Sequence, residues 1–233
     1  MTIKDSKREK RLNDVKALLD IFALRHQDSR QKRLIKAEKF ISDFKSLRRS
    51  LINVRDPELN VFDILGFGNN EVELSSMLAW LMDEHESHYH GNLFLKTFVN
   101  LLALPLHTEM LSEYRVLTEH GGKEAIIDIM VYKKPDFLLY IENKVLSAEG
   151  DDQTPREFRD MRRIGLSLGI PESRQFAIFL TPDGRPPKDQ DHWHSLSLNV
   201  LSGAYVKIGE HIRSPKLNFL LGDLHETTTR WSQ

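Results

Sequence analysis

The sequence predicts an α/β fold, in which a mixed β-sheet is flanked by helices and preceded by a helical extension. Three observations support this prediction. Before residue 105, apolar residues recur at helical spacing. After it, β-branched and aromatic runs are separated by turn residues. Helical and strand-like segments then alternate, which gives the core the order α–β–β–β–α–β and indicates an α/β sheet.

The composition is that of a globular protein, and it excludes several kinds of chemistry. The chain has 233 residues, 40% of them apolar, and no cysteine. Without cysteine there are no disulfides, no thiolate nucleophile and no cysteine-based zinc site. No apolar run reaches the ~18 residues typical of a membrane span, and the charged N-terminus does not resemble a secretory signal. We therefore expect a cytoplasmic protein with no membrane partner.

Charge divides the chain into two predicted domains, residues 1–57 and 58–233. The first contains 16 Lys and Arg but only 8 Asp and Glu, whereas acidic residues predominate in the second. Apolar spacing predicts two amphipathic helices over 8–25 and 30–53, which form a basic helical hairpin that ends at Pro57. Such a hairpin suits packing, self-association (a homodimer) or binding of a partner protein, and its basic face suits nucleic acid.

The core elements are expected in a definite order. Asn69 and Asn70 are candidate caps for a helix that begins near Glu71. The remaining expected helices cover 92–104 and 152–168, with one more after residue 198. The expected strands are Tyr114–Glu119, Ala125–Tyr132, Phe137–Val145, Phe176–Leu180 and His194–Leu198.

The hairpin formed by the second and third strands contains two acidic residues in apolar surroundings. Glu142 and Lys144 share one face of their strand, because alternate residues of a strand do so. If the turn consists of the three residues 134–136, Asp128 lies directly opposite Glu142, with the Cβ atoms about 4.5–5.5 Å apart. A loop of two or four residues would instead place Asp128 on the other face.

Two neighbouring carboxylates and an ammonium favour one kind of chemistry. The carboxylates repel each other unless a cation lies between them, and Mg²⁺, or Mn²⁺ in its place, suits such oxygen ligands. Lys144 would orient the attacking water and stabilise charge on phosphate. Together these groups indicate hydrolysis of a phosphodiester. The alternative is a structural Lys–Glu pair on the sheet surface, with Asp128 near the end of the sheet.

These residues resemble the PD-(D/E)XK nuclease superfamily, in which an Asp on one strand is followed by Glu-x-Lys on the next. Here the residues are Asp128 and Glu142-Asn143-Lys144. The resemblance covers about residues 60–200 and implies a restriction-endonuclease-like core with a divalent metal. It rests on five blocks in the family's order: NVFDILG (60–66), EVELSSMLAWLM (71–82), GNLFLKTF (91–98), IENKV (141–145) and FLTPDG (179–184).

The resemblance also implies site residues on two helices. An acid of the first core helix matches Glu71, which would bind the metal directly or through water, in addition to Asp128 and Glu142. Glu73 is the competitor, but it lies about 200° around the helix from Glu71. The family often has a Gln on the helix after Glu-x-Lys, followed by an aromatic residue. Gln153 fits that position, although Phe158 follows five residues later and a Thr-Pro pair intervenes.

The function that follows is a Mg²⁺-dependent nuclease, a phosphodiesterase for which DNA is favoured over RNA as the substrate. By resemblance alone, a restriction-like or anti-phage defence role is expected. One rival is a catalytically silent module that binds nucleic acid or regulates a partner. Another is a toxin subunit that a partner holds inactive through residues 1–57. His85, His88 and His90 do not form the His-Glu-x-x-His zinc pattern, so they are expected to be polar loop residues.

Overall fold

The computed structural model describes residues 39, 42, 59–66, 70–145 and 147–232. The chain divides into two units, Met1–Glu58 and Leu59–Gln233, and the architecture below is that of the second unit. The helical hairpin predicted over 1–57 lies outside the described residues, except for Lys39 and Ser42. That hairpin and the predicted domain boundary at residue 57 stay predictions.

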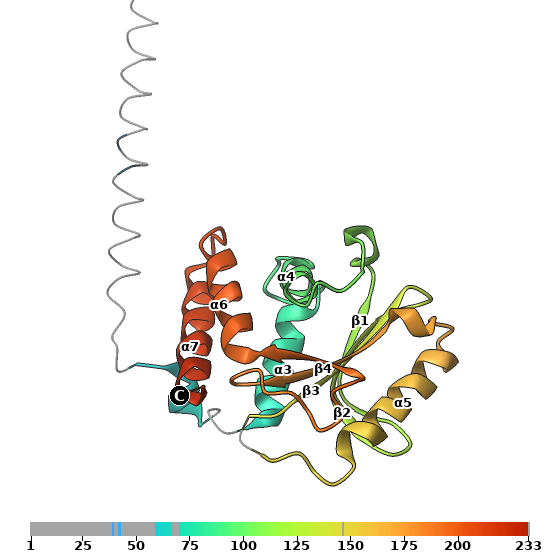
Figure 1. Ribbon diagram of the computed structural model, residues 1–233. Coiled ribbons are helices and arrows are strands. Elements are labelled where there is room, and N and C mark those ends of the chain that lie inside the picture. Colours follow the sequence, from blue (N-terminus) through green and yellow to red (C-terminus); the bar gives the residue numbers. More distant parts are fainter. Residues whose placement is uncertain (1–38, 40–41, 43–58, 67–69, 146, 233) are drawn as a thin grey trace, which may run out of the picture. The chain divides into compact units, whose positions relative to one another are not determined.

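A mixed five-stranded sheet forms the centre of the unit (Figure 1). The strands follow one another in space as they do in the sequence. The first three pair antiparallel and the last three pair parallel. The strands are β1 (Arg115–Gly121), β2 (Ile126–Lys133), β3 (Phe137–Asn143), β4 (Gln175–Thr181) and β5 (Trp193–Ser197).

Helices cover both faces of the sheet (Figure 1). On one face, four helices share an apolar cluster with the sheet: α3 (Glu71–Met82), α4 (Leu93–Leu101), α6 (Leu198–Gly209) and α7 (Pro215–Trp231). The other packs against α5 (Gln153–Ser167), the crossover helix that parallel pairing of β3 with β4 requires. The short helix α2 (Val61–Leu65) is joined to α7 by a hydrogen bond from the Val61 N–H to Asp223.

The central strand β3 explains the apolar run in the sequence. Leu139 and Ile141 pack in the larger apolar cluster, whereas Leu138 and Tyr140 pack in the cluster beneath α5. Every residue of the strand is buried. A strand covered on both faces has no polar side, so it reads as a continuous apolar segment.

The predicted fold class is confirmed, and the predicted strands differ from the observed ones by only one or two residues at most ends. Among the residues that the structure describes, two helices were not predicted. Helix α2 has only five residues, too few to show a helical period. Helix α7 mixes apolar residues with many polar ones, including three consecutive threonines at 227–229. None of the helices in the described residues is long and apolar enough to cross a membrane.

Candidate active site

The strands β2 and β3 separate at one end of the sheet. The three-residue turn predicted at 134–136 is present, and Lys133 pairs with Phe137. The register continues to the pair Ile129 and Ile141. Beyond that pair, β2 continues along β1, whereas β3 continues along β4. The next two residues in this register are Asp128 and Glu142, so the predicted register is confirmed and the two acids lie where the strands diverge.

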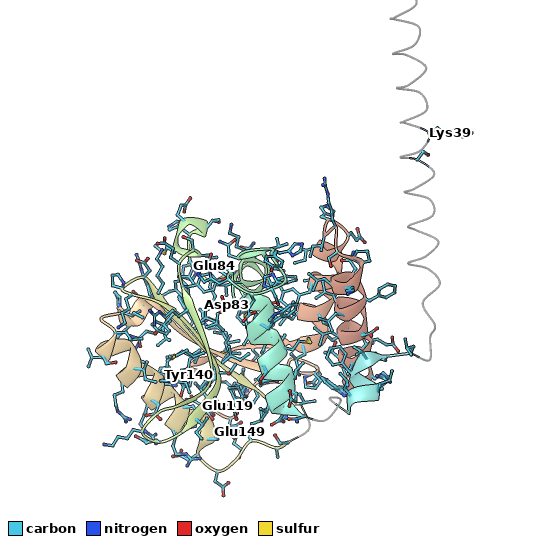
Figure 2. The ribbon with its side chains drawn as sticks, turned by 180° about the vertical axis from the view of Figure 1, so that it is seen from behind. Lys39, Asp83, Glu84, Glu119, Tyr140 and Glu149 are labelled. Carbon is cyan, nitrogen blue, oxygen red and sulfur yellow. The ribbon has the colours of Figure 1, made fainter. Side chains whose placement is uncertain are left out.

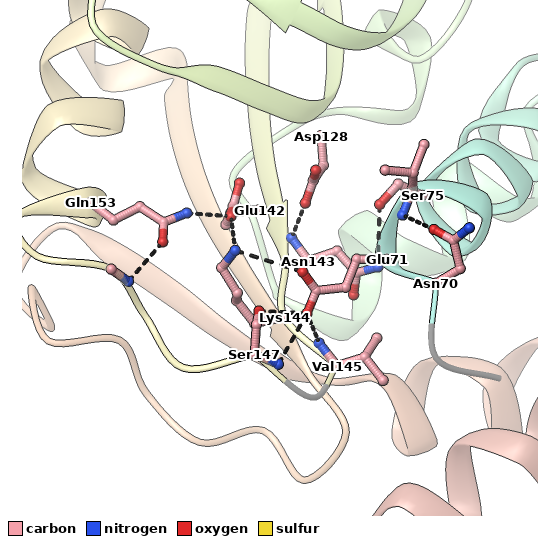
Figure 3. A network of polar contacts seen from close by, with 12 residues as sticks. Asn70, Glu71, Ser75, Asp128, Glu142, Asn143, Lys144, Val145, Ser147 and Gln153 are labelled. Atoms are coloured by element: carbon pink, nitrogen blue, oxygen red, sulfur yellow. Dashed lines mark hydrogen bonds and ion pairs between the residues drawn. The ribbon is translucent and has the colours of Figure 1, made fainter. Parts of the chain in front are cut away.

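Asp128 replaces the missing strand pairing with a side-chain contact. Its Oδ2 atom accepts a hydrogen bond from the backbone N–H of Asn143 at 2.8 Å (Figure 3). On the other side of Asp128, the residue at the opposite position of β1 is Glu119, which is labelled in Figure 2 and has a φ of 47°. Asp128 is therefore held against β3 while a second carboxylate lies nearby.

Glu142 is the buried centre of the site, with 2% of the residue exposed. Its Oε1 atom accepts from Lys144 Nζ at 2.9 Å and from Gln153 Nε2 at 2.6 Å (Figure 3). The structure thus brings Lys144 and Gln153, two residues predicted from the sequence, onto one carboxylate oxygen. Gln153 is the first residue of α5, so this contact also joins the crossover helix to the end of β3.

Glu71 holds the segment that follows β3. It is the first residue of α3, whose N-terminus is capped by the side chain of Asn70. Its Oε1 atom accepts from the backbone N–H of Val145 at 2.9 Å and from the Ser147 hydroxyl at 2.7 Å. Its Oε2 atom is 3.8 Å from Lys144 Nζ. Glu73 is exposed, so Glu71 is the acid of this helix that contacts the cluster.

Asn143 joins β3 to α3 from the opposite face of the strand. Its Nδ2 atom donates to the Ser75 hydroxyl at 3.2 Å, and the residue is fully buried. Asn143 therefore faces α3, on the side of the strand opposite to Glu142 and Lys144, as strand alternation predicts. The same helix therefore positions the strand through Ser75 and the following segment through Glu71.

Glu157 belongs to the cluster but was not predicted. It lies one helical turn after Gln153 on α5 and is 1% exposed. Its Oε1 atom accepts from Gln153 Nε2 at 2.8 Å, while its buried Oε2 atom has no hydrogen-bond partner. The sequence held one signal for this residue. Glu157 is a polar residue four positions after Gln153, and that spacing places both side chains on one face of a helix.

Burial, together with neighbouring negative charges, raises the pKa of Glu142, Glu157 and the partly buried Asp128. Burial, followed by the charges of Asp128 and Glu157, raises the pKa of Glu142 to about 9, although Lys144 opposes this. Burial raises the pKa of Asp128 to about 6, against the hydrogen bond from Asn143. Burial raises the pKa of Glu157 to about 7 despite the contact with Gln153. The cluster holds more negative charge than its protein neighbours offset.

The two groups at the rim remain charged. Burial lowers the pKa of Lys144, but the carboxylates of Glu142, Glu71 and Asp128 together raise it above its usual value. Burial raises the pKa of Glu71, but hydrogen bonds from Ser147 and Val145, together with the charge of Lys144, bring it below its usual value. Lys144 is therefore an ammonium between carboxylates.

The donor set fits a hard divalent cation. Asp128 and Glu142 offer carboxylate oxygens, and a doubly charged ion between them would offset the repulsion that raises the pKa of Glu142. Within the described part of the chain, no three His, Asp or Glu side chains are already arranged as a metal-binding group. The fit is therefore to two carboxylates, with water and substrate oxygens completing the coordination.

Of the three histidines between α3 and α4, His88 has a structural role. His88 is 6% exposed and packs edge-to-face against Trp80 and Phe94. Its Nδ1 atom accepts from the His90 N–H at 3.0 Å, so its Nε2 atom donates to the Asp83 carbonyl at 2.9 Å. Both ring nitrogens are engaged, which leaves neither to bind a metal.

The comparison with protein families agrees with this geometry. A family model described as the PD-(D/E)XK nuclease superfamily matches residues 59–222. The chain belongs to this superfamily. No curated protein and no solved structure matches the sequence. The matched range contains the diverging strands, α3 and α5.

Membership in the PD-(D/E)XK superfamily indicates a phosphodiesterase and, in general, a nucleic acid as substrate. The superfamily typically uses divalent metals. The individual roles predicted for Asp128, Glu142, Lys144, Glu71 and Gln153 are not tested by this match. They stay predictions, which the contacts described above support.

Proposed function

We propose that the protein is a divalent-metal-dependent nuclease that hydrolyses phosphodiester bonds, with DNA as the favoured substrate. The observation that carries the proposal is the placement of Asp128, Glu142 and Lys144 at the point where β2 and β3 diverge. Burying two acids and one ammonium there destabilises the fold, and the pKa of Glu142, which is raised to about 9, reflects this cost. A purely structural role would not account for that cost.

The metal would be held by Asp128 and Glu142. Mg²⁺, or Mn²⁺ in its place, supplies a Lewis acid that polarises a phosphoryl oxygen and favours ionisation of bound water. The oxygens available for it are on Asp128, which is fixed by the Asn143 N–H, and on Glu142, which is fixed by Gln153.

Lys144 would act on the phosphate and the attacking water. Its Nζ atom is held 2.9 Å from Glu142 and 3.8 Å from Glu71, so the ammonium has a defined position. From there it would orient the water and stabilise the negative charge that develops on phosphate. Gln153 would contribute by holding Glu142 in place.

Glu71 remains in the proposed site as the third carboxylate. Three hydrogen bonds reach its Oε1 atom, from Val145 and from both donors of Ser147. Any direct role as a metal ligand would therefore use Oε2. Its contacts support a role in fixing Lys144, Val145 and Ser147.

The test is cleavage of supercoiled plasmid, linear DNA and RNA of matched sequence with Mg²⁺ or Mn²⁺. We expect the wild-type protein to cut DNA faster than RNA. Asp128→Asn, Glu142→Gln and Lys144→Ala should each lower the rate about 10²–10³-fold. Lys207→Ala, which removes an exposed ammonium from α6, should leave the rate unchanged.

Two outcomes would contradict the proposal. Wild-type cleavage that survives both Lys144→Ala and Asp128→Asn would remove the mechanism. Metal-dependent binding of nucleic acid without any product would instead favour a silent binding or regulatory module. A defence role stays a prediction from the family resemblance.

A further inference from the structure

A hollow of about 500 Å³ lies beside the acidic cluster. The turn at 122–125 between β1 and β2, together with Ile126, forms one wall, and Gln153, Arg156 and Glu157 of α5 form the other. Gln153 is common to the hollow and to the cluster, because its Nε2 atom is 2.6 Å from Glu142. A molecule in the hollow would therefore lie next to the proposed reaction centre.

The wall formed by the turn is held firmly against α5. The buried carboxylate of Asp160 accepts from the backbone N–H groups of Lys123, Glu124 and Ala125 at 3.2, 2.7 and 2.8 Å. Glycine is required at position 122, since a Cβ atom there would lie 2.3 Å from Asp160 Oδ2. The turn thus has a defined shape before any ligand binds.

The exposed charge at the opening of the hollow is positive, and the acid Glu157 lines the hollow from a buried position. Lys123 and Arg156 are exposed, and neither forms an ion pair with any residue that the structure describes. The acid on the same wall, Glu124, is paired with two arginines, at 2.9 Å from Arg159 and 2.7 Å from Arg163. Two cations without ion pairs among the described residues therefore line the opening, where the exposed carboxylate of Glu124 is already paired with arginines.

An apolar side chain lies beside these cations. Ile126, the first residue of β2, is 66% exposed and lines the hollow. A large exposed aliphatic group next to two cations matches a nucleotide, which presents a phosphate and, a few bonds away, the apolar faces of its sugar and base. A free anion would need the cations alone, so Ile126 favours the nucleotide.

We propose that the hollow binds the nucleotide adjacent to the scissile phosphate of a nucleic-acid strand. Lys123 and Arg156 contact its phosphate, and Ile126 packs against its sugar and base. This inference rests on the proposed nuclease function and adds the position of the flanking nucleotide. It also assigns substrate binding to residues outside the acidic cluster.

The test measures binding of fluorescein-labelled DNA and RNA oligonucleotides by anisotropy, with Mg²⁺, in full-length protein carrying Lys144→Ala to prevent cleavage. Lys123→Ala and Arg156→Ala should each weaken binding about threefold to tenfold and lower the salt slope by about one. Ile126→Ala should weaken binding without changing that slope. The DNA and RNA arms show which sugar the hollow prefers.

The matched control is Arg115→Ala. It removes an exposed cation at the other end of β1, ~20 Å from the turn. Binding and melting temperature should equal those of the parent protein. The other three side chains are also at the surface, so their replacement should leave the melting temperature unchanged.

The outcomes separate the two proposals. If the protein with Lys144 intact cuts nucleic acid, but the variants at 123, 126 and 156 bind and cut as the Arg115→Ala control does, the hollow is not the subsite and the nuclease function stands. If the wild-type protein neither binds nor cuts any of the probes, the proposed function fails and this inference fails with it.

Discussion

Asp160 and Glu157 lie three residues apart on α5, and each is 1% exposed, but their surroundings differ. Asp160 accepts from three backbone N–H groups of the 122–125 turn and from Arg163. Glu157 accepts one hydrogen bond from Gln153, and its Oε2 atom has no partner. One helix therefore buries two carboxylates. Hydrogen bonds and an ion pair offset the burial cost of Asp160, whereas a single hydrogen bond does so for Glu157.

The difference distinguishes a structural acid from an acid in a functional cluster. Buried charges are stable when hydrogen bonds and opposite charges surround them, as they do around Asp160. The group around Glu142 and Glu157 lacks that compensation, and burial raises the pKa of both acids. An uncompensated cluster is costly to the fold, which favours the view that a further positive charge completes it.

The largest expected effect is the loss of stability when Asp160, the acid with full hydrogen bonding, is replaced. Asp160→Ala would leave three buried N–H groups and Arg163 without their acceptor, so the free energy of unfolding should fall by about 3–5 kcal/mol. Urea unfolding followed by circular dichroism measures this. Asp160→Asn retains an acceptor and should lose less. An unchanged unfolding midpoint for Asp160→Ala would show that these contacts do not hold the turn.

The next effect is the pH dependence of the metal-free protein. The folded pKa values of Glu142 (about 9), Glu157 (about 7) and Asp128 (about 6) exceed those of an unfolded chain. Between about pH 5 and 9 the folded state therefore binds protons that the unfolded state has released. The free energy of unfolding should fall as the pH rises through this window.

Thermal melts in EDTA from pH 5 to 9 test this. Glu142→Gln removes the acid with the highest pKa and should flatten the decline above pH 7, with a higher melting temperature than wild type at pH 8. Mg²⁺ should raise the wild-type melting temperature most at high pH, since metal binding requires ionised carboxylates. Wild-type melts that rise steadily with pH would contradict the electrostatics described here.

The smallest effect concerns the rim of the cluster. Glu71→Ala removes the acceptor for Val145 and Ser147 and should lower the free energy of unfolding at pH 7 by about 1–2 kcal/mol. Because the pKa of Glu71 is lowered, its contribution is present above about pH 4.5 and is lost as the pH falls. Urea unfolding at pH 7 and pH 4 measures both.

Glu73→Ala is the matched control, as Glu73 is an exposed acid on the same helix turn. It should change neither the unfolding midpoint nor its pH dependence. Equal effects of the two variants would mean that Glu71 acts only through the helix dipole and not through the segment after β3.

Much of the sheet was predictable because its signals are local. A three-residue turn sets the register of β2 and β3, and alternation along the strands then places Asp128 and Glu142 at matching positions. Asn70 similarly marked the start of α3, because a cap acts on the next few residues. Helix α7 was missed because its apolar residues are interspersed with many polar ones, which obscures the helical period in the sequence.

The sequence by itself determined that Asp128, Glu142 and Lys144 lie on one hairpin, because strand alternation and the turn residues are local signals. The structure decided the turn length of three residues, and with it the register that places Asp128 at the position opposite Glu142. Only the tertiary structure decided what surrounds them. The contact between Glu71 and Val145 spans 74 residues. The burial of Glu157 and the hollow beside Ile126 depend on how α5 lies on the sheet. Such contacts arise from the packing of apolar faces, and no local spacing encodes them.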